Sequence, residues 1–468
     1  MAREKMPDVI VLLPGITGSE LKKNGKVVWG WSGKALGKNL LTLGGQFYDD
    51  LALARDSATE ESLGDGITAE KVIPDLHLFP GLWKIDGYTK VSDYIRQEFE
   101  VEEGRNFFSF PYDWRRDNRF SARMLQKKTA DWLRTWRQGS GKADAKLILV
   151  GHSMGGLVSR YFLEVLEGWR DTRALITFGT PYRGAVNAVN SLSNGEKKFG
   201  ILDLTRLART LTALYQLLPI YECYDAGDGK LQRVAEAAGV PNVDAARAQD
   251  ALRFHREIED AVNRHLDDGQ YRDQGYRTYP VVGYMQPTSQ SARKDGNGVE
   301  ILPTYKGEDL GGDGTVPRVS ATPIEQKDAA GAMFAATKHG SLQNADTVLT
   351  QLRGLMTGFY IAGPTFRAAR PTGVRLTLEN DDVYAAGEKI AIRARPQPPG
   401  GTLAATFEDV ESGQEVLRAP LRKQAEGWQS VEFPPPRAGA YRVTVTGDDV
   451  LEPARDAFEV LPAAPGGR

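Results

Sequence analysis

Two hydrophobic patterns alternate along residues 8 to about 360 of the 468-residue chain. Short runs such as residues 9–13 and 147–150 are apolar at every position, which is typical of strands buried on both faces of a parallel sheet. Between them, apolar residues recur three and four positions apart, as in amphipathic helices. The alternation predicts an α/β fold with a mostly parallel sheet covered by helices on both faces. The predicted strands are residues 9–13, 106–110, 146–150, 175–178 and 279–284, and the predicted helices are residues 91–99, 121–137, 157–166 and 345–355.

Two long insertions interrupt this alternation, at about residues 21–87 and 187–274. Insertions of this length in a compact fold are usually caps or lids. The second insertion is predicted to be helical, because apolar residues recur in it at helix spacing: Ile201, Leu204, Leu207, Leu211, Leu214, Leu217 and Leu218. Such leucines form either a hydrophobic core or the wall of a ligand pocket, and the pattern leaves both interpretations open.

The pattern becomes strictly alternating beyond residue 362. Apolar and polar residues alternate around positions 374–378, 390–394 and 441–445, and proline-rich turns separate these segments. Five to seven short strands with such turns in about 90 residues predict an immunoglobulin-like β-sandwich. The predicted organisation is a domain at residues 1–362, a linker at 363–372, the sandwich at 373–462 and a disordered tail at 463–468.

Composition excludes several classes of protein. The net charge is −2 and no basic tract occurs, which argues against a nucleic-acid partner. No run of 18 apolar residues occurs, so no membrane span is predicted, and the charged residues 1–8 do not fit a signal peptide. We therefore expect a cytoplasmic protein, with peripheral contact at a membrane as a further expectation. The single cysteine, Cys223, excludes an internal disulfide and is predicted to be buried.

A serine lies at a sharp turn between a predicted strand and a predicted helix. Residues 151–155 read Gly-His-Ser-Met-Gly, directly after the strand at 146–150 and before the helix at 157–166. The pattern G-x-S-x-G in this context is typical of the nucleophile elbow of α/β-hydrolases, whose strained turn lifts the serine hydroxyl clear of the sheet. Ser153 is therefore the candidate nucleophile.

A serine hydroxyl needs a base, and the chain has only five histidines. His152 lies inside the turn and faces the wrong way, and His77 lies in the first insertion. His255 and His265 lie in polar helical stretches of the second insertion, where we expect them at the surface. His339 lies on a loop before the last predicted helix, where α/β-hydrolases carry their base, and it is the candidate base.

The acid that orients the base must lie between the serine and the histidine in chain order. Asp313 is the best candidate, because glycines on both sides give a tight turn from which the carboxylate projects. Asp309 nearby and Asp225 in the second insertion are its rivals.

An oxyanion hole needs two backbone amide donors. The amide of Met154 is one candidate, because it opens the predicted helix. The amide of Ile16 is the other, on a loop after the first strand where Gly15 permits the turn. Zinc-ligand pairs, paired cysteines and nucleotide-binding glycine motifs are absent, so no metal or cofactor is predicted.

Six segments together carry a family resemblance: Leu-Pro-Gly at 13–15, Phe-Pro-Tyr-Asp-Trp-Arg at 110–115, Gly-His-Ser-Met-Gly-Gly at 151–156, Thr-Phe-Gly-Thr-Pro at 177–181, Gly-Asp-Gly-Thr-Val-Pro at 312–317 and Lys-His at 338–339. Over residues 8 to about 360 the chain resembles the lecithin:cholesterol acyltransferase family. The segment at 110–115 is the most specific, because most α/β-hydrolases lack it.

The resemblance implies an α/β-hydrolase core with Ser153, Asp313 and His339 as its triad, a membrane-facing subdomain near the first insertion, and a mobile lid. The residues themselves predict that Asp113 and Arg115 form a buried pair that orients loops near the pocket, with direct substrate contact as the alternative. The chain departs from the secreted animal members of the family in having no pair of cysteines for their disulfides, and in its C-terminal sandwich.

The candidate substrate contacts are Gly15, Trp83, Leu214 and Leu217. Trp83, with Trp29 and Trp31, fits either a lipid interface or an ordinary core.

These features predict a serine-dependent lipid acyl hydrolase or O-acyltransferase. One alternative is an esterase on small soluble esters. Another is a catalytically silent hydrolase-fold protein that the β-sandwich directs to a protein, lipid or glycan. The strands that carry Arg393, Arg395 and Arg442 are expected to present a solvated face.

Overall fold

The computed structural model describes residues 3–462 with gaps at 31–48, 75–76, 80–82, 196, 199–201, 327–331, 361–373, 386, 435, 449 and 451–452. The side chains of residues 77–79, 83–85, 197–198 and 202 are also outside the description. Trp31, the side chains of His77 and Trp83, the predicted linker at 363–372 and the predicted tail at 463–468 therefore lie outside the described residues.

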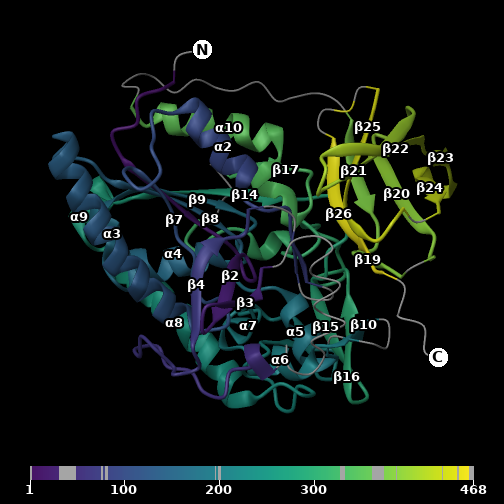
Figure 1. Cartoon of the computed structure of the whole chain (residues 1–468). Coiled ribbons are helices and arrows are strands. Elements are labelled where there is room, and N and C mark those ends of the chain that lie inside the picture. The colour runs from purple at the N-terminus through teal and green to yellow at the C-terminus, as the bar shows by residue number, and fades with distance from the viewer. Residues whose placement is uncertain are drawn as a thin grey trace.

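A six-stranded parallel sheet forms the centre of the first part of the chain (Figure 1). In spatial order its strands are β17 (Met333–Ala335), β14 (Arg277–Gly283), β9 (Thr172–Phe178), β8 (Leu147–His152), β1 (Val9–Leu13) and β7 (Phe107–Ser109). The prediction of a mostly parallel sheet is confirmed. The edge strand β17 was not predicted, because three residues with a half-exposed Phe334 carry too little apolar pattern.

Helices cover both faces of this sheet, because alternate strand residues enter two separate hydrophobic clusters. On β1, Val9 and Val11 enter one cluster and Ile10 enters the other. The first cluster includes side chains of α3 (Asn118–Ser140) and α4 (Met154–Glu164). The second includes side chains of α2 (Thr89–Glu98) and α10 (Asp346–Gly358), which lie side by side in Figure 1.

In the described part of the first insertion, most of the regular structure is short strands. A three-stranded antiparallel sheet joins β2 (Ser19–Lys23), β3 (Lys26–Trp29) and β4 (Ile67–Val72), and β5 (His77–Phe79) pairs with β6 (Trp83–Ile85). Trp29 is fully buried and packs edge-on against Trp114, so it belongs to the core.

The second insertion is only partly helical, which corrects the prediction. Its helices are α5 (Val186–Ser193), α6 (Thr205–Thr210), α7 (Thr212–Tyr215), α8 (Ala245–Leu266) and α9 (Gly269–Gln274). It also contains β12 (Tyr224–Asp225) and β13 (Leu231–Gln232), which form a four-stranded sheet with β15 (Ser291–Asp295) and β16 (Gly298–Leu302). β12 and β13 are two residues long, which is too short to show a periodic pattern, and β15, the other partner of β12, lies after β14 in the sequence.

The leucines of the second insertion form core rather than an open wall in this structure. They are buried in the cluster that contains α3 and α4: Leu204, Leu207, Leu211, Leu214, Leu217 and Leu218. Cys223 is buried in the same cluster, which confirms its predicted burial. Its backbone groups are hydrogen-bonded to those of Gln232 and Ala292.

Residues 374–462 form two sheets that share one hydrophobic cluster, and we call them the C-terminal sandwich (Figure 1). One sheet contains β18 (Arg375–Glu379), β20 (Ile390–Gln397), β24 (Gln429–Phe433) and β23 (Arg422–Lys423). The other contains β19 (Val383–Tyr384), β26 (Ala454–Val460), β25 (Gly439–Gly447), β21 (Leu403–Asp409) and β22 (Gln414–Pro420). The alternating residues of β18, β20 and β25 point into the shared core. The immunoglobulin-like class and the domain boundaries stay predictions.

The expectation that Arg442 lies on a solvated face of the C-terminal sandwich is wrong. Arg442 on β25 is half-buried, because its guanidinium forms an ion pair with Asp86 of the first part.

Among the described residues, no helix is long and apolar enough to cross a bilayer.

We expect the stability of the C-terminal sandwich to depend on pH through Glu459. Burial raises the pKa of this carboxyl from 4.5 to about 8. Between these values the folded protein holds a proton that the unfolded chain has lost, so the free energy of unfolding falls as pH rises from about 4.5 to about 8. Glu459→Gln removes this loss and is expected to raise the melting temperature by several degrees at pH 8.5, with little change at pH 4.5.

The matched control is Glu415→Gln, on the exposed strand β22 of the same sandwich. It is expected to leave the pH dependence of melting as in the wild type. Equal effects of Glu459→Gln at both pH values would contradict the prediction.

Candidate active site

The backbone at Ser153 is strained and held by three hydrogen bonds. Its φ of 51° and ψ of −122° lie where residues other than glycine rarely occur. The Ser153 amide donates to the Phe178 carbonyl (2.8 Å), and the Ser153 carbonyl accepts from the Gly156 amide (3.0 Å) and the Thr180 hydroxyl (2.9 Å). Neighbouring strand β9 and the loop after it therefore fix the turn between β8 and α4.

Two glycines after the serine allow other backbone and side-chain atoms to approach. A Cβ on Gly155 would lie 2.5 Å from the Pro14 carbonyl oxygen, and one on Gly156 would lie 2.0 Å from the Thr180 hydroxyl oxygen. Both distances are far shorter than van der Waals contact, so a larger residue would push the start of α4 away from the loop after β1 at Gly155, and away from the loop after β9 at Gly156.

The Ser153 hydroxyl, the His339 imidazole and the Asp313 carboxylate form a continuous hydrogen-bond chain. Ser153 Oγ lies 2.9 Å from His339 Nε2, and His339 Nδ1 lies 2.8 Å from Asp313 Oδ2. A carboxylate only accepts, so Nδ1 carries the proton and Nε2 accepts from the serine. All three residues are buried, with exposed fractions of 3%, 4% and 1% in that order.

The Asp313 carboxylate is oriented by its own loop. Its Oδ1 accepts from the amides of Thr315 (2.9 Å) and Val316 (2.7 Å), while its carbonyl accepts from the His339 amide (2.8 Å). The rivals lie elsewhere: Asp309 bonds to the Gln290 side chain, and Asp225 accepts amides of its own turn.

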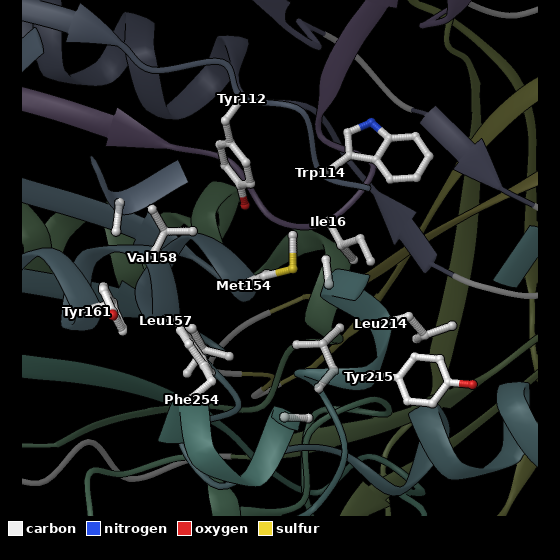
Figure 2. Close-up of a cluster of buried hydrophobic side chains, with 14 of the residues drawn as sticks. Ile16, Tyr112, Trp114, Met154, Leu157, Val158, Tyr161, Leu214, Tyr215 and Phe254 are labelled. Atoms are coloured by element: carbon white, nitrogen blue, oxygen red, sulfur yellow. The ribbon is translucent and has the colours of Figure 1, made fainter. Parts of the chain in front are cut away.

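The loop after β1 lies directly against the serine. A Cβ on Gly15 would lie 2.9 Å from the Ser153 Cβ, so only glycine fits this contact. The neighbouring Ile16 side chain is buried near Met154, the first residue of α4, as Figure 2 shows. The first amides of a helix have no partner within the helix, so the position of Met154 fits the predicted oxyanion donor, and the roles of the Met154 and Ile16 amides stay predictions.

The Phe-Pro-Tyr-Asp-Trp-Arg segment holds this loop in place. The Tyr112 hydroxyl donates to the Pro14 carbonyl (2.8 Å), the Tyr112 amide donates to the Ser19 hydroxyl (3.1 Å), and the Trp114 indole donates to the Ser19 carbonyl (3.2 Å). These bonds attach both ends of the loop to a segment about 95 residues later in the sequence. Figure 2 shows both aromatic rings beside Ile16 and Met154.

Asp113 and Arg115 form a bidentate ion pair in the same segment. Arg115 Nε and Nη2 donate to the two Asp113 oxygens at 2.9 and 2.7 Å, and the Arg115 side chain is fully buried. Arg115 also donates to Asp65 (2.8 Å) and to the Leu51 carbonyl (3.2 Å). The pair thus attaches the first insertion to the core. That it orients loops near the pocket, or contacts the substrate, stays a prediction.

A second buried hydrogen-bond chain, which the sequence did not reveal, joins three parts of the site. The Gly15 amide donates to the Tyr88 hydroxyl (2.8 Å), and that hydroxyl lies 2.8 Å from His152 Nδ1. His152 Nε2 lies 3.1 Å from the His339 carbonyl. Burial, and then the nearby His339, lower the pKa of His152 to about 3, so its ring is neutral. The His339 carbonyl can only accept, so the single proton of the neutral His152 ring lies on Nε2, and Nδ1 accepts from the Tyr88 hydroxyl. Donation therefore runs in one direction, from Gly15 through Tyr88 and His152 to His339.

His255 and His265 are buried, and the expectation that they lie at the surface is wrong. His255 Nε2 donates to the Gln216 carbonyl (2.8 Å), and burial lowers the pKa of His255 to about 4. His265 lies between Glu164 (2.8 Å) and Glu167 (2.9 Å). The face of α8 that carries them packs on α4, a contact the polar composition of α8 conceals.

The predicted substrate contacts are only partly visible. Leu214 and Leu217 are buried in the same cluster as Ile16 and Met154, and Figure 2 draws Leu214 among these buried side chains. The Trp83 side chain is outside the described residues. Within the described ranges, no group of three or more acidic, histidine or cysteine side chains is arranged to hold a metal ion.

A family model, lecithin:cholesterol acyltransferase, matches residues 83–262. The resemblance to the lecithin:cholesterol acyltransferase family is thereby confirmed. The match includes the turn at Ser153 and the segment at 110–115, and it ends before Asp313 and His339. The protein lecithin-cholesterol acyltransferase-like 4 of Arabidopsis thaliana is 34% identical over 99 residues, which are 20% of this chain. The chain covers only 17% of that relative's length.

Two solved structures resemble the chain at low sequence identity. The Tle4–Tli4 complex contains a chain with 15% identity and a TM-score of 0.43, covering 77% of this chain and 98% of that one. The Bacillus licheniformis lipase BlEst2 in propeptide form has 14% identity and a TM-score of 0.37, covering 98% of this chain and 75% of that one.

Removal of the Tyr88 hydroxyl tests the second hydrogen-bond chain. Tyr88→Phe leaves the Gly15 amide and His152 Nδ1 without their buried partner, and each unsatisfied group costs about 1–3 kcal/mol. We expect chemical denaturation to show a loss of about 2–4 kcal/mol in the free energy of unfolding. The matched control is Tyr182→Phe, which deprives only the Thr177 hydroxyl of a partner. The Thr177 hydroxyl can rotate toward another acceptor, so a smaller loss in the free energy of unfolding is expected for Tyr182→Phe. Equal losses for the two variants would contradict a special role of the Tyr88–His152 hydrogen-bond chain in stability.

Proposed function

We propose that the protein is a serine-dependent lipid acyl hydrolase or O-acyltransferase. The observation that carries this proposal is the hydrogen-bond chain from Ser153 through His339 to Asp313, at a strained turn between β8 and α4. The match to the lecithin:cholesterol acyltransferase family supports the same kind of reaction. Such a chain turns a weakly nucleophilic alcohol into one that attacks an ester.

The first half of the proposed reaction acylates the serine. Ser153 Oγ bonds to the ester carbonyl carbon while its proton passes to His339 Nε2, and Asp313 stabilises the imidazolium. The carbonyl oxygen becomes an oxyanion that accepts from the amides of Ile16 and Met154. The intermediate then collapses: the bond to the leaving alcohol breaks, and that alcohol takes the proton from His339.

The second half removes the acyl group. Water or an acceptor alcohol gives its proton to His339 Nε2 as its oxygen attacks the acyl-enzyme, and Ser153 leaves with the same proton. Water yields a free acid, whereas an alcohol yields a new ester. Both outcomes use the same residues, so the choice between hydrolase and transferase depends on which acceptor reaches the acyl-enzyme.

An apolar environment supports an acyl chain as the substrate group. Ser153 is buried, and the side chains of Ile16, Met154, Leu214 and Leu217 belong to one hydrophobic cluster. Entry of an acyl chain here would replace apolar contacts with apolar contacts, at little cost in solvation. Peripheral contact with a membrane and a cytoplasmic location stay part of the proposal.

Product analysis of wild type and Ser153→Ala tests this function. Each protein is incubated with mixed phospholipid vesicles, with and without a sterol or long-chain alcohol, and products are identified by mass spectrometry. We expect free fatty acid and lysolipid, or esters of the added alcohol, from the wild type, and at least about a 10³-fold lower rate from Ser153→Ala.

The matched control is Ser159→Ala, six residues later in α4, whose hydroxyl donates to the Gly155 carbonyl of its own helix. It is expected to keep most of the wild-type rate. If no lipid product depends on Ser153 but short soluble esters are cleaved, the lipid assignment fails. If neither substrate reacts, the protein is not an esterase.

A further inference from the structure

The residue before His339 is anchored to the C-terminal sandwich. Lys338 Nζ donates to Asp456 on β26 at 2.6 Å and to the Asn380 side chain at 3.4 Å. The Asp456 side chain is only 2% exposed. A buried carboxylate needs a charged partner, so this ion pair holds the backbone of Lys338, and with it the start of the His339 loop, at one place.

The residue after His339 is anchored to the same sandwich through a relay. Arg442 on β25 donates twice to the Asp86 carboxylate, at 2.6 and 3.1 Å. The Asp86 amide in turn donates to the Gly340 carbonyl at 2.8 Å. The sandwich therefore reaches both sides of His339.

The loop that carries the acid is also attached to the sandwich. The buried Gln286 side chain donates to the Leu376 carbonyl (3.2 Å) and accepts from the Leu378 amide (3.2 Å), both on β18. Its own amide donates to the Gly312 carbonyl (3.0 Å), and Gln286 pairs with Asp313 as an isolated bridge.

The junction between the sandwich and the first part is polar and hollow. Among the described residues, no hydrophobic cluster combines side chains from both parts. Two cavities of about 270 and 620 Å³ are lined by both, the smaller including Asp313, His339 and Asp456. The relative position of the two parts therefore depends on directed polar bonds, and several of those bonds end next to the base and the acid.

We propose that the C-terminal sandwich is a clamp that positions His339 and Asp313, with the Lys338–Asp456 ion pair as its main contact. The inference rests on the proposed function. It assigns the sandwich a role in the chemical step, in place of docking onto a separate partner. A hydrogen-bonded base must hold its geometry to a fraction of an ångström, and a 1 Å displacement costs about 10²-fold in rate.

The test compares Asp456→Asn, which keeps the shape but removes the charge, with Lys338→Met and the conservative Lys338→Arg. Full-length proteins are assayed with a soluble p-nitrophenyl ester. We expect about 10- to 100-fold lower kcat for the first two, with KM changed less than about threefold and most of kcat restored in Lys338→Arg. The matched control Arg455→Met removes another ion pair of the same junction, Arg455–Asp346 (2.9 Å), and is expected to leave kcat unchanged.

Proton NMR gives a readout that does not need turnover. The His339 Nδ1 proton bonded to Asp313 is expected to give a low-field resonance in the wild type and Arg455→Met, and to lose it or shift it in Asp456→Asn and Lys338→Met. Thermal melting checks that each variant is folded. Should Asp456→Asn fail to fold, the partly exposed Lys338→Met decides the question.

The outcomes separate the clamp from the proposed function. Wild-type kcat and an unchanged low-field resonance in folded Lys338→Met and Asp456→Asn would overturn the clamp. A wild-type protein without Ser153-dependent turnover would overturn the proposed function, and the resonance would then decide the clamp. Equal losses of kcat in Arg455→Met and Asp456→Asn would also overturn the clamp, because they would show that any weakening of the junction lowers kcat, whichever ion pair is removed.

Discussion

The site depends on one strained residue, because Ser153 must hold a backbone conformation that its side chain disfavours. The cost is of order 1–3 kcal/mol, and it is offset only where surrounding bonds over-determine the turn. Here the Phe178 carbonyl, the Thr180 hydroxyl and the Gly156 amide do so. The strain also explains the glycines, since a turn this sharp brings α4 within reach of the Pro14 carbonyl and leaves no volume for a side chain.

Around this turn, the site is assembled from loops that are far apart in the sequence but joined by buried polar bonds. Tyr88 and His152 connect the Gly15 loop with the His339 carbonyl, and Tyr112 supports the same Gly15 loop from its other side. Buried polar groups of this kind are costly when unpaired, so each bond also selects against other arrangements of the loops. The hydrophobic clusters stabilise the layers, while the polar chains determine where the reactive atoms lie.

The sequence predicted what depends on local pattern. Apolar runs identified the central strands other than β17, and strict alternation identified β18, β20 and β25 of the sandwich. Chain order selected His339 and Asp313, which the structure places in one hydrogen-bond chain with Ser153. What it could not predict depends on contacts between distant segments. The bond of His255 to the Gln216 carbonyl joins α8 to the end of α7, and no pattern within α8 indicates this partner, although Ala251, Leu252, Ile258 and Val262 recur at helix spacing and place His255 on their buried face. The same holds for the small sheet of the second insertion and for the bonds of Lys338 and Arg442 to partners across the junction.

Cys223 gives the protein an internal chemical probe. It is the only thiol of the chain, it is fully buried where β12 meets β13 and β15, and burial raises the pKa of its thiol. A thiol that is both inaccessible and protonated reacts only when its surroundings open. The rate at which a thiol reagent modifies the native protein therefore reports how often the second insertion separates from the core, with no engineered label and no competing site.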